Sequence, residues 1–220
     1  MIKLPTATRG PNQCYSLNNT RKGVIVENVM SEQRAIFIDR DGVVIHDRGL
    51  LHRKELVELI PKSAEAIQLL HREGYLVIMV TNQPVVARGF CSIEKIEEIH
   101  GYMENLLQTE GARLDKILYC PHHPAPKGKV GPNGPNHTYV KDCACRKPKP
   151  GMILQAQKDF TLDLSACYMI GDSISDVKTG HDAGCKTILI ETGKDDPFHD
   201  AVPDYTATSL YDAVKNIVLQ

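Results

Sequence analysis

"RAIFIDRDG", residues 34–42, is a short apolar run that ends in acidic residues and a glycine. Such a run is typical of a buried strand that passes into a loop. Asp39 and Asp41 follow the run two positions apart, so both carboxylates can reach one site. Their mutual repulsion would be relieved by a cation that prefers oxygen ligands, such as Mg²⁺. Because an isolated Asp-x-Asp pair is more often a solvated turn, the rest of the chain must decide between the two interpretations.

After this stretch, short apolar runs typical of buried strands alternate along the chain with segments whose apolar residues recur at helical spacing. Further strands are expected at 75–84, 114–120, 166–173 and 185–193, and helices at 63–74, 92–111, 151–160, 174–184 and 209–220. The alternation predicts the α/β class, with a Rossmann-like, doubly wound parallel sheet covered by helices on both faces. Ligands of such sheets bind beyond the carboxyl ends of the strands.

The composition is that of an ordinary globular protein. The chain has 220 residues, 42% hydrophobic and 24% charged, with a formal net charge of -1. This balance argues against nucleic acid or an anionic membrane surface as a general partner. No apolar run approaches the roughly 20 residues that a membrane span needs. We expect a monomer.

The chain divides into an N-terminal extension and one domain. Residues 1–30 are polar and rich in turn formers, and they are expected to be loosely ordered. Residues 31–220 are expected to form a single domain, a size that one hydrophobic core can support. The globular pattern begins just after Met30, so one hypothesis is that translation naturally starts there.

Seven cysteines occur in a chain that has no secretory leader pattern at its start. An odd number argues against a disulfide framework and favours a reducing compartment, so a cytoplasmic protein is expected. Clustered cysteines in such a protein are more often metal ligands.

Polar residues recur wherever a predicted strand ends. Thr81, Asn82 and Gln83 end the second strand, and "GDSISD" with Asp172 ends a later one. Arg146 and Lys147 could balance the charge of a phosphoryl group, although each alone could be a solvated surface charge. Asp176 could ligate the cation or only cap the following helix. Chance is a poor explanation for all of these features in this order.

The ordered set resembles the haloacid dehalogenase superfamily of phosphohydrolases. Its four motifs correspond to "DRDGV", "TNQ", "RKPKPG" and "GDSISD". Over residues 34–193 the motif sequences are similar to those of one subgroup, the D-glycero-D-manno-heptose 1,7-bisphosphate phosphatases and the related histidinol phosphate phosphatases. Only a short stretch, 43–60, follows the first motif, so no large cap domain is expected.

The resemblance implies a role for each catalytic residue. Asp39 would be the nucleophile that forms an aspartyl-phosphate, and Asp41 would act as general acid and then general base. Asp39, Asp172 and the backbone carbonyl of Asp41 would hold Mg²⁺. Thr81 and Lys147 would hold the phosphoryl oxygens. The residues expected to contact substrate are Asp47, Arg48, Gly49, Leu50, Asn82, Gln83, Pro84 and Arg146.

The same subgroup carries a zinc-binding loop, expected here over 120–146. Cys120, His122, Cys143 and Cys145 would supply three thiolates and one imidazole to Zn²⁺, a closed tetrahedral set with a structural role. His123 is the competing imidazole, and free thiols in a loose loop are the alternative interpretation. Because Cys145 directly precedes Arg146 and Lys147, the metal would fix where the two cations point.

Three functions are compatible with these motifs. The leading one is a Mg²⁺-dependent phosphomonoester hydrolase that removes the 7-phosphate of D-glycero-D-manno-heptose 1,7-bisphosphate. The second is hydrolysis of histidinol phosphate or another small sugar phosphate by the same residues. The third is a zinc-stabilised interaction module with a basic loop. The module lacks the interleaved aromatic residues that single-strand binding favours, and it leaves the acidic motifs unexplained.

Overall fold

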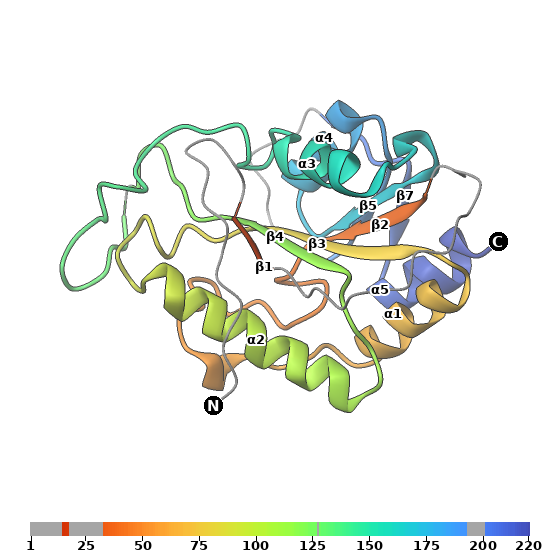
Figure 1. Cartoon of the computed structure of the whole chain (residues 1–220), viewed down its shortest axis with the longest axis horizontal. Coiled ribbons are helices and arrows are strands. Elements are labelled where there is room, and N and C mark those ends of the chain that lie inside the picture. The colour runs from red at the N-terminus through yellow and green to blue at the C-terminus, as the bar shows by residue number, and fades with distance from the viewer. Residues whose placement is uncertain (1–14, 18–32, 127, 193–200) are drawn as a thin grey trace.

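The computed structural model describes residues 15–17, 33–126, 128–192 and 201–220 (Figure 1). In these residues one sheet has the strand order β1-β4-β3-β2-β5-β6-β7. All neighbouring strands run parallel except β1, which is antiparallel to β4. The strands are β1 (Tyr15–Leu17), β2 (Ala35–Ile38), β3 (Leu76–Asn82), β4 (Lys116–Cys120), β5 (Tyr168–Gly171), β6 (Lys186–Ile190) and β7 (Tyr205–Ala207).

The predicted α/β fold is confirmed, and β2 is its centre. From β2 the chain builds β3 and β4 on one side and then returns to build β5, β6 and β7 on the other. The crossovers therefore diverge between β2 and β5, and a crevice is expected beyond the carboxyl ends of these two strands. All four residues of β2 are buried, as suits a strand covered on both faces.

Helices cover both faces of the sheet (Figure 1). On one face lie α3 (Gly151–Phe160) and α4 (Ile174–Ala183), and on the other lie α1 (Ser63–Arg72), α2 (Ile93–Thr109) and α5 (Leu210–Ala213). Two separate apolar cores match the two faces. The Ser92 side chain accepts the backbone N–H of Lys95 at 3.3 Å and so caps the start of α2.

Two short strands and the C-terminus differ from the sequence prediction. The patterns missed β7 and β1, because three-residue strands are too short for a readable alternation. The helix expected over 209–220 is α-helical only at Leu210–Ala213 and continues as a π-helix at Val214–Val218. Apart from β1, the expected loose extension and Met30 lie outside the described residues.

The stretch 43–60, after the first motif, contains little regular secondary structure. It holds one short 3₁₀ helix, Lys54–Leu56, and Ile45 pairs with Leu59 in an isolated antiparallel bridge. No helix among the described residues is both long and apolar enough to cross a bilayer.

Candidate active site and metal centre

Asp39 is the first residue beyond β2. Its backbone N–H donates to Ile170 O at 3.0 Å, so β2 and β5 stay paired up to the point where the carboxylate emerges. Its Oδ1 accepts the Arg40 backbone N–H at 2.7 Å and lies 3.0 Å from Lys147 Nζ. The predicted nucleophile and the predicted phosphate-binding lysine, far apart in sequence, are therefore in direct contact.

Lys147 is held from several directions. Its Nζ donates to Val80 O at 3.0 Å and lies 2.5 Å from Asp176 Oδ1. Its backbone is clamped by Asn82, whose Oδ1 accepts the Lys147 N–H at 3.1 Å and whose Nδ2 donates to Lys147 O at 3.0 Å. The ammonium group is almost fully buried, so the two carboxylates rather than water balance its charge. Burial alone would lower the Lys147 pKa, but the Asp176 and Asp39 carboxylates raise it.

Three carboxylates gather at the predicted magnesium site. Asp39, Asp172 and Asp176 each offer an oxygen, and these atoms all lie within 4.8 Å of one another. Octahedral ligands of Mg²⁺ would be separated by about 3 to 4.2 Å. Burial, opposed by Lys147 and reinforced by the Asp39 and Asp172 carboxylates, raises the pKa of Asp176 to about 7. The single ammonium group of Lys147 cannot balance the charge of three carboxylates, so a cation is needed there, and these oxygen donors fit a magnesium ion.

Two glycines let the acidic residues approach the backbone. A Cβ at Gly42, which has a φ of +79°, would meet Asp172 Oδ2 at 1.9 Å. A Cβ at Gly171 would meet the Asp176 carboxyl group at 2.2 Å. The glycine in "DRDG" and the one in "GDS" therefore make room for the carboxylates of the cluster.

Asp41 lies in a network of its own beside this cluster. Arg40 Nη2 donates to its Oδ2 at 3.0 Å, and Gln83 Nε2 donates to the same oxygen at 3.1 Å. Gln83 Nε2 is also 3.0 Å from Thr81 Oγ1. Burial raises the pKa of the Asp41 carboxyl group above its ordinary value; Arg40 opposes this shift and Asp39 adds to it. A raised pKa suits a group that must first donate a proton.

Arg40 was missed by the sequence reasoning. It is only 1% exposed, and besides Asp41 it contacts Gln83 Oε1 at 2.8 Å and His100 Nε2 at 3.2 Å. Burial and Arg40 hold the pKa of His100 well below its usual range. No sequence signal separates a buried arginine between two aspartates from a solvated one.

Asp176 caps the following helix, which is one of the two roles that the sequence left open, and it also contacts Lys147. Its Oδ2 accepts the Ser173 backbone N–H at 3.2 Å in a capping box at the start of α4, while its Oδ1 faces Lys147. The Ser-x-x-Asp spacing was a signal for the first role. Only the packing of α4 reveals the contact with Lys147.

The expected substrate contacts fall into two groups. Asp47, Arg48 and Gly49 are exposed on the stretch after β2, and Leu50 beside them is partly packed on the core. By contrast, the Asn82 and Gln83 amides are engaged by Lys147 and Asp41, and Pro84 opens a turn in which its carbonyl accepts the Arg88 N–H at 2.8 Å. The roles of all these residues in substrate binding stay predictions.

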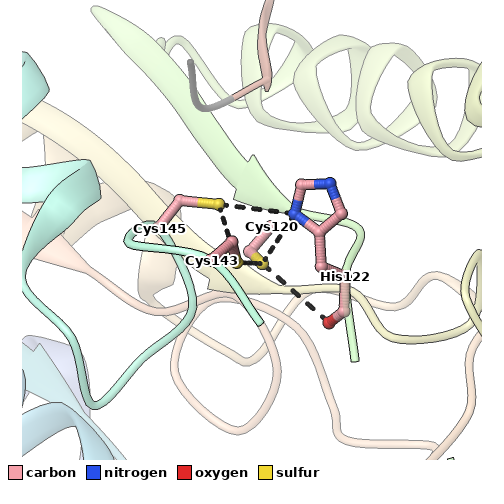
Figure 2. A group of neighbouring side chains, drawn as sticks. All are labelled: Cys120, His122, Cys143 and Cys145. Atoms are coloured by element: carbon pink, nitrogen blue, oxygen red, sulfur yellow. Dashed lines mark hydrogen bonds between the residues drawn. The ribbon is translucent and has the colours of Figure 1, made fainter. Parts of the chain in front are cut away.

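The predicted zinc ligands form a second cluster. Figure 2 shows the sulfur atoms of Cys120, Cys143 and Cys145 and the Nδ1 atom of His122 close together. The Cys143 sulfur lies 3.5 Å from that of Cys120 and 3.3 Å from that of Cys145, and His122 Nδ1 lies 3.7 and 3.6 Å from the same two sulfurs. A tetrahedral zinc ion would separate such ligands by about 3.7 Å. The four residues could therefore hold zinc.

Charge supports the same conclusion. Contacts with the Cys143 and Cys145 thiols, together with burial, raise the pKa of Cys120, because three thiolates cannot be ionised together without a cation. Arg146 Nη1 donates to the carbonyl oxygen of His122 at 3.1 Å. A metal that fixes His122 and Cys145 would thus fix Arg146 both through the chain and through this hydrogen bond.

Replacing Cys143 by serine tests the cluster. We expect Cys143→Ser to lose the bound zinc and to lower the thermal stability, because a hydroxyl is a poor zinc ligand and the loop loses its cross-link. Zinc content by elemental analysis and thermal unfolding would measure both effects. Cys91→Ser, at another half-buried thiol outside the cluster, is the control; equal zinc contents in the two variants would contradict the assignment.

Comparison with known proteins agrees with the site. The family model described as HAD-hydrolase-like matches residues 144–213. A D-glycero-beta-D-manno-heptose-1,7-bisphosphate 7-phosphatase of Pasteurella multocida is 42% identical over 163 residues, covering 74% of this chain and 84% of the relative. A D-glycero-D-manno-heptose-1,7-bisphosphate 7-phosphatase of Chlorobaculum tepidum is 35% identical over 201 residues, covering 86% and 96%.

A solved structure is also similar. The D,D-heptose 1,7-bisphosphate phosphatase of B. bronchiseptica, complexed with magnesium and phosphate, has a TM-score of 0.68 and 26% identity, with 85% of this chain and 98% of that chain covered. The class of protein that fold and site define is thus the HAD-like hydrolases. Within that class, the chain belongs to the family of D-glycero-D-manno-heptose-1,7-bisphosphate 7-phosphatases, which confirms the resemblance seen in the sequence.

Proposed function

We propose that this protein is a magnesium-dependent phosphatase that removes the 7-phosphate of D-glycero-D-manno-heptose 1,7-bisphosphate. The observation that carries the proposed reaction is the meeting of Asp39, Lys147 and Asp172 beyond the carboxyl ends of β2 and β5, where the crossovers of the sheet diverge. The names of the curated relatives support the proposed substrate.

In the first step, the Asp39 carboxylate attacks the phosphorus of the 7-phosphate. A bond from its oxygen to phosphorus forms while the bond from phosphorus to the sugar oxygen breaks, which leaves an aspartyl-phosphate. Lys147 and Thr81 hold the transferring oxygens, where negative charge is spread. Asp39 and Asp172 would hold the magnesium ion with the Asp41 carbonyl. When bound, this ion neutralises charge on the phosphoryl group.

Asp41 handles the proton in both steps. It donates a proton to the sugar oxygen as that oxygen leaves, and then accepts one from the water that hydrolyses the aspartyl-phosphate. The Arg40 and Gln83 contacts with Asp41 keep its carboxyl group oriented. We therefore assign Gln83 to the positioning of Asp41, and Asn82 to the positioning of Lys147.

Substrate selection is assigned to Arg146 and to the stretch from Asp47 to Leu50. We assign to Arg146 the binding of the second charged group of a bisphosphate; the hydrogen bond of its guanidinium group to His122 O in the zinc loop supports this assignment. The stretch from Asp47 to Leu50, joined by the 2.7 Å hydrogen bond from Gly49 N–H to Asp47 Oδ1, contributes polar contacts to the sugar.

Phosphate release tests the proposal. The substrates are the α and β anomers of heptose 1,7-bisphosphate and histidinol phosphate, each assayed with Mg²⁺ and with a chelator in excess. We expect rapid, magnesium-dependent release from one heptose anomer. Hydrolysis of histidinol phosphate alone would overturn the substrate and keep the chemistry, whereas no release from any of them would overturn the assigned activity.

We also infer that the enzyme works as a monomer in the cytoplasm, with a small sugar phosphate as its partner. The thiol cluster fits a reducing compartment. Large exposed apolar side chains in the described part of the chain come from different elements rather than from one helix face.

A further inference from the structure

Strand β1 comes from the N-terminal extension, yet it lies against the zinc loop. It pairs with the edge of β4 so that Tyr15 stands opposite Tyr119, the residue before the zinc ligand Cys120. In Figure 1, β1 lies beside β4 at the border of the sheet. A strand of three residues adds few backbone hydrogen bonds, so its side chains must supply much of the attachment.

The Tyr15 ring joins an aromatic group around the zinc ligand His122. Its centroid lies 5.5 Å from that of Tyr119, 6.2 Å from the His122 imidazole at an angle of 64°, and 6.2 Å from Tyr139. Tyr139 in turn lies 6.0 Å from His122. Separations and angles of this kind are those of favourable aromatic pairs.

These rings connect the two halves of the zinc site. Tyr119 and His122 belong to the half that contains Cys120, whereas Tyr139 precedes Cys143 by four residues in the long segment between the ligands. The backbone bond from His123 N–H to Tyr139 O, at 3.2 Å, joins the halves at the same place. His122 is 5% exposed, so little water reaches its ring.

We propose that Tyr15 is a positioning residue that covers His122, holds the two halves of the zinc site together and thereby fixes Arg146. The Tyr15 ring packs against the His122 imidazole and so holds His122 in place. The backbone carbonyl of His122 accepts the hydrogen bond from Arg146 Nη1, so the position of His122 affects that of Arg146. Groups that orient a metal ligand commonly affect both metal retention and activity. The part of the proposal that concerns Arg146 and substrate rests on the proposed phosphatase function.

Zinc transfer from the full-length protein to a coloured chelator in excess tests the proposal without substrate. We expect Tyr15→Ala to release zinc about three- to tenfold faster than the wild type, the factor that loss of an aromatic pair implies. Tyr15→Phe keeps the ring and should stay within about twofold. The matched control is Tyr211→Ala, a partly buried ring packed between Lys62 and Lys215 on another face; it should release zinc at the wild-type rate.

Zinc release at the wild-type rate in Tyr15→Ala would overturn the inference. Equal acceleration in Tyr211→Ala would also overturn it, because the effect would then be a general loosening of the fold. If Tyr15→Ala folds too poorly to purify, Tyr15→Leu, which keeps bulk but removes the aromatic face, should still accelerate release.

A second readout concerns the substrate. Tyr15→Ala should raise the KM for heptose bisphosphate several-fold while kcat changes less, because Arg146 is displaced and Asp39 is not. An unchanged KM would remove the link to Arg146. Accelerated zinc release in a protein that hydrolyses no heptose bisphosphate would overturn the proposed function and leave the role of Tyr15 at the metal site in place.

Discussion

Asp39→Asn is expected to reduce phosphate release by about 10⁴-fold or more, the scale seen when the nucleophile of a covalent mechanism is removed. The amide cannot form the aspartyl-phosphate and is also a weaker magnesium ligand. Steady-state release of phosphate from the preferred heptose anomer measures the loss. Trapping of the phosphorylated enzyme by rapid acid quench should succeed for the wild type and fail for the variant.

Folding must be shown to survive this change. Neutralising Asp39 weakens its ion pair with Lys147 but also removes its repulsion of Asp176, and because these two effects oppose each other the thermal midpoint should stay close to that of the wild type. Asp159→Asn makes the same replacement at a remote carboxylate that pairs with Lys116 at 2.6 Å, and its activity should be unchanged. Wild-type turnover in Asp39→Asn would eliminate Asp39 as nucleophile.

Lys147→Met is expected to affect both stability and activity. The substitution keeps an apolar stem of similar length but removes the ammonium group, so Asp39 and Asp176 face each other without it. Breaking a buried ion pair by removal of one partner typically costs about 3–5 kcal/mol of folding free energy. Loss of one donor to the phosphoryl group should lower kcat by about 10²- to 10³-fold.

Urea unfolding and phosphate release, both in excess Mg²⁺, measure the two effects. Lys149→Met is the matched control, since Lys149 is exposed and pairs with Asp142 at 2.6 Å near the surface; exposed pairs contribute little. If Lys147→Met matched this control in stability, the ion pair with Asp39 and Asp176 would carry no net folding energy. If it matched the control in kcat, Lys147 would have no part in binding the phosphoryl group.

Much of the fold was predictable because its signals are local. The buried run at 34–42 and the helical spacing at 92–111 depend on neighbours within one element, and the structure places a strand at Ala35–Ile38 and a helix at Ile93–Thr109 there. The short strands β1 and β7 were not predictable, since three residues form a strand only when an existing edge accepts them.

The sequence by itself determined the chemical groups and their order along the chain: paired aspartates after a strand, a Thr-Asn-Gln strand end, a lysine after two cysteines and a late Gly-Asp. Residue type and short spacing carry this information, because they fix which donors and acceptors one loop can present. Tertiary structure alone decided that Lys147 lies between Asp39 and Asp176, that Arg40 turns inward onto Asp41, and that Tyr15 reaches His122. These contacts join segments that come together only when the sheet closes and its helices pack, so no local pattern encodes them.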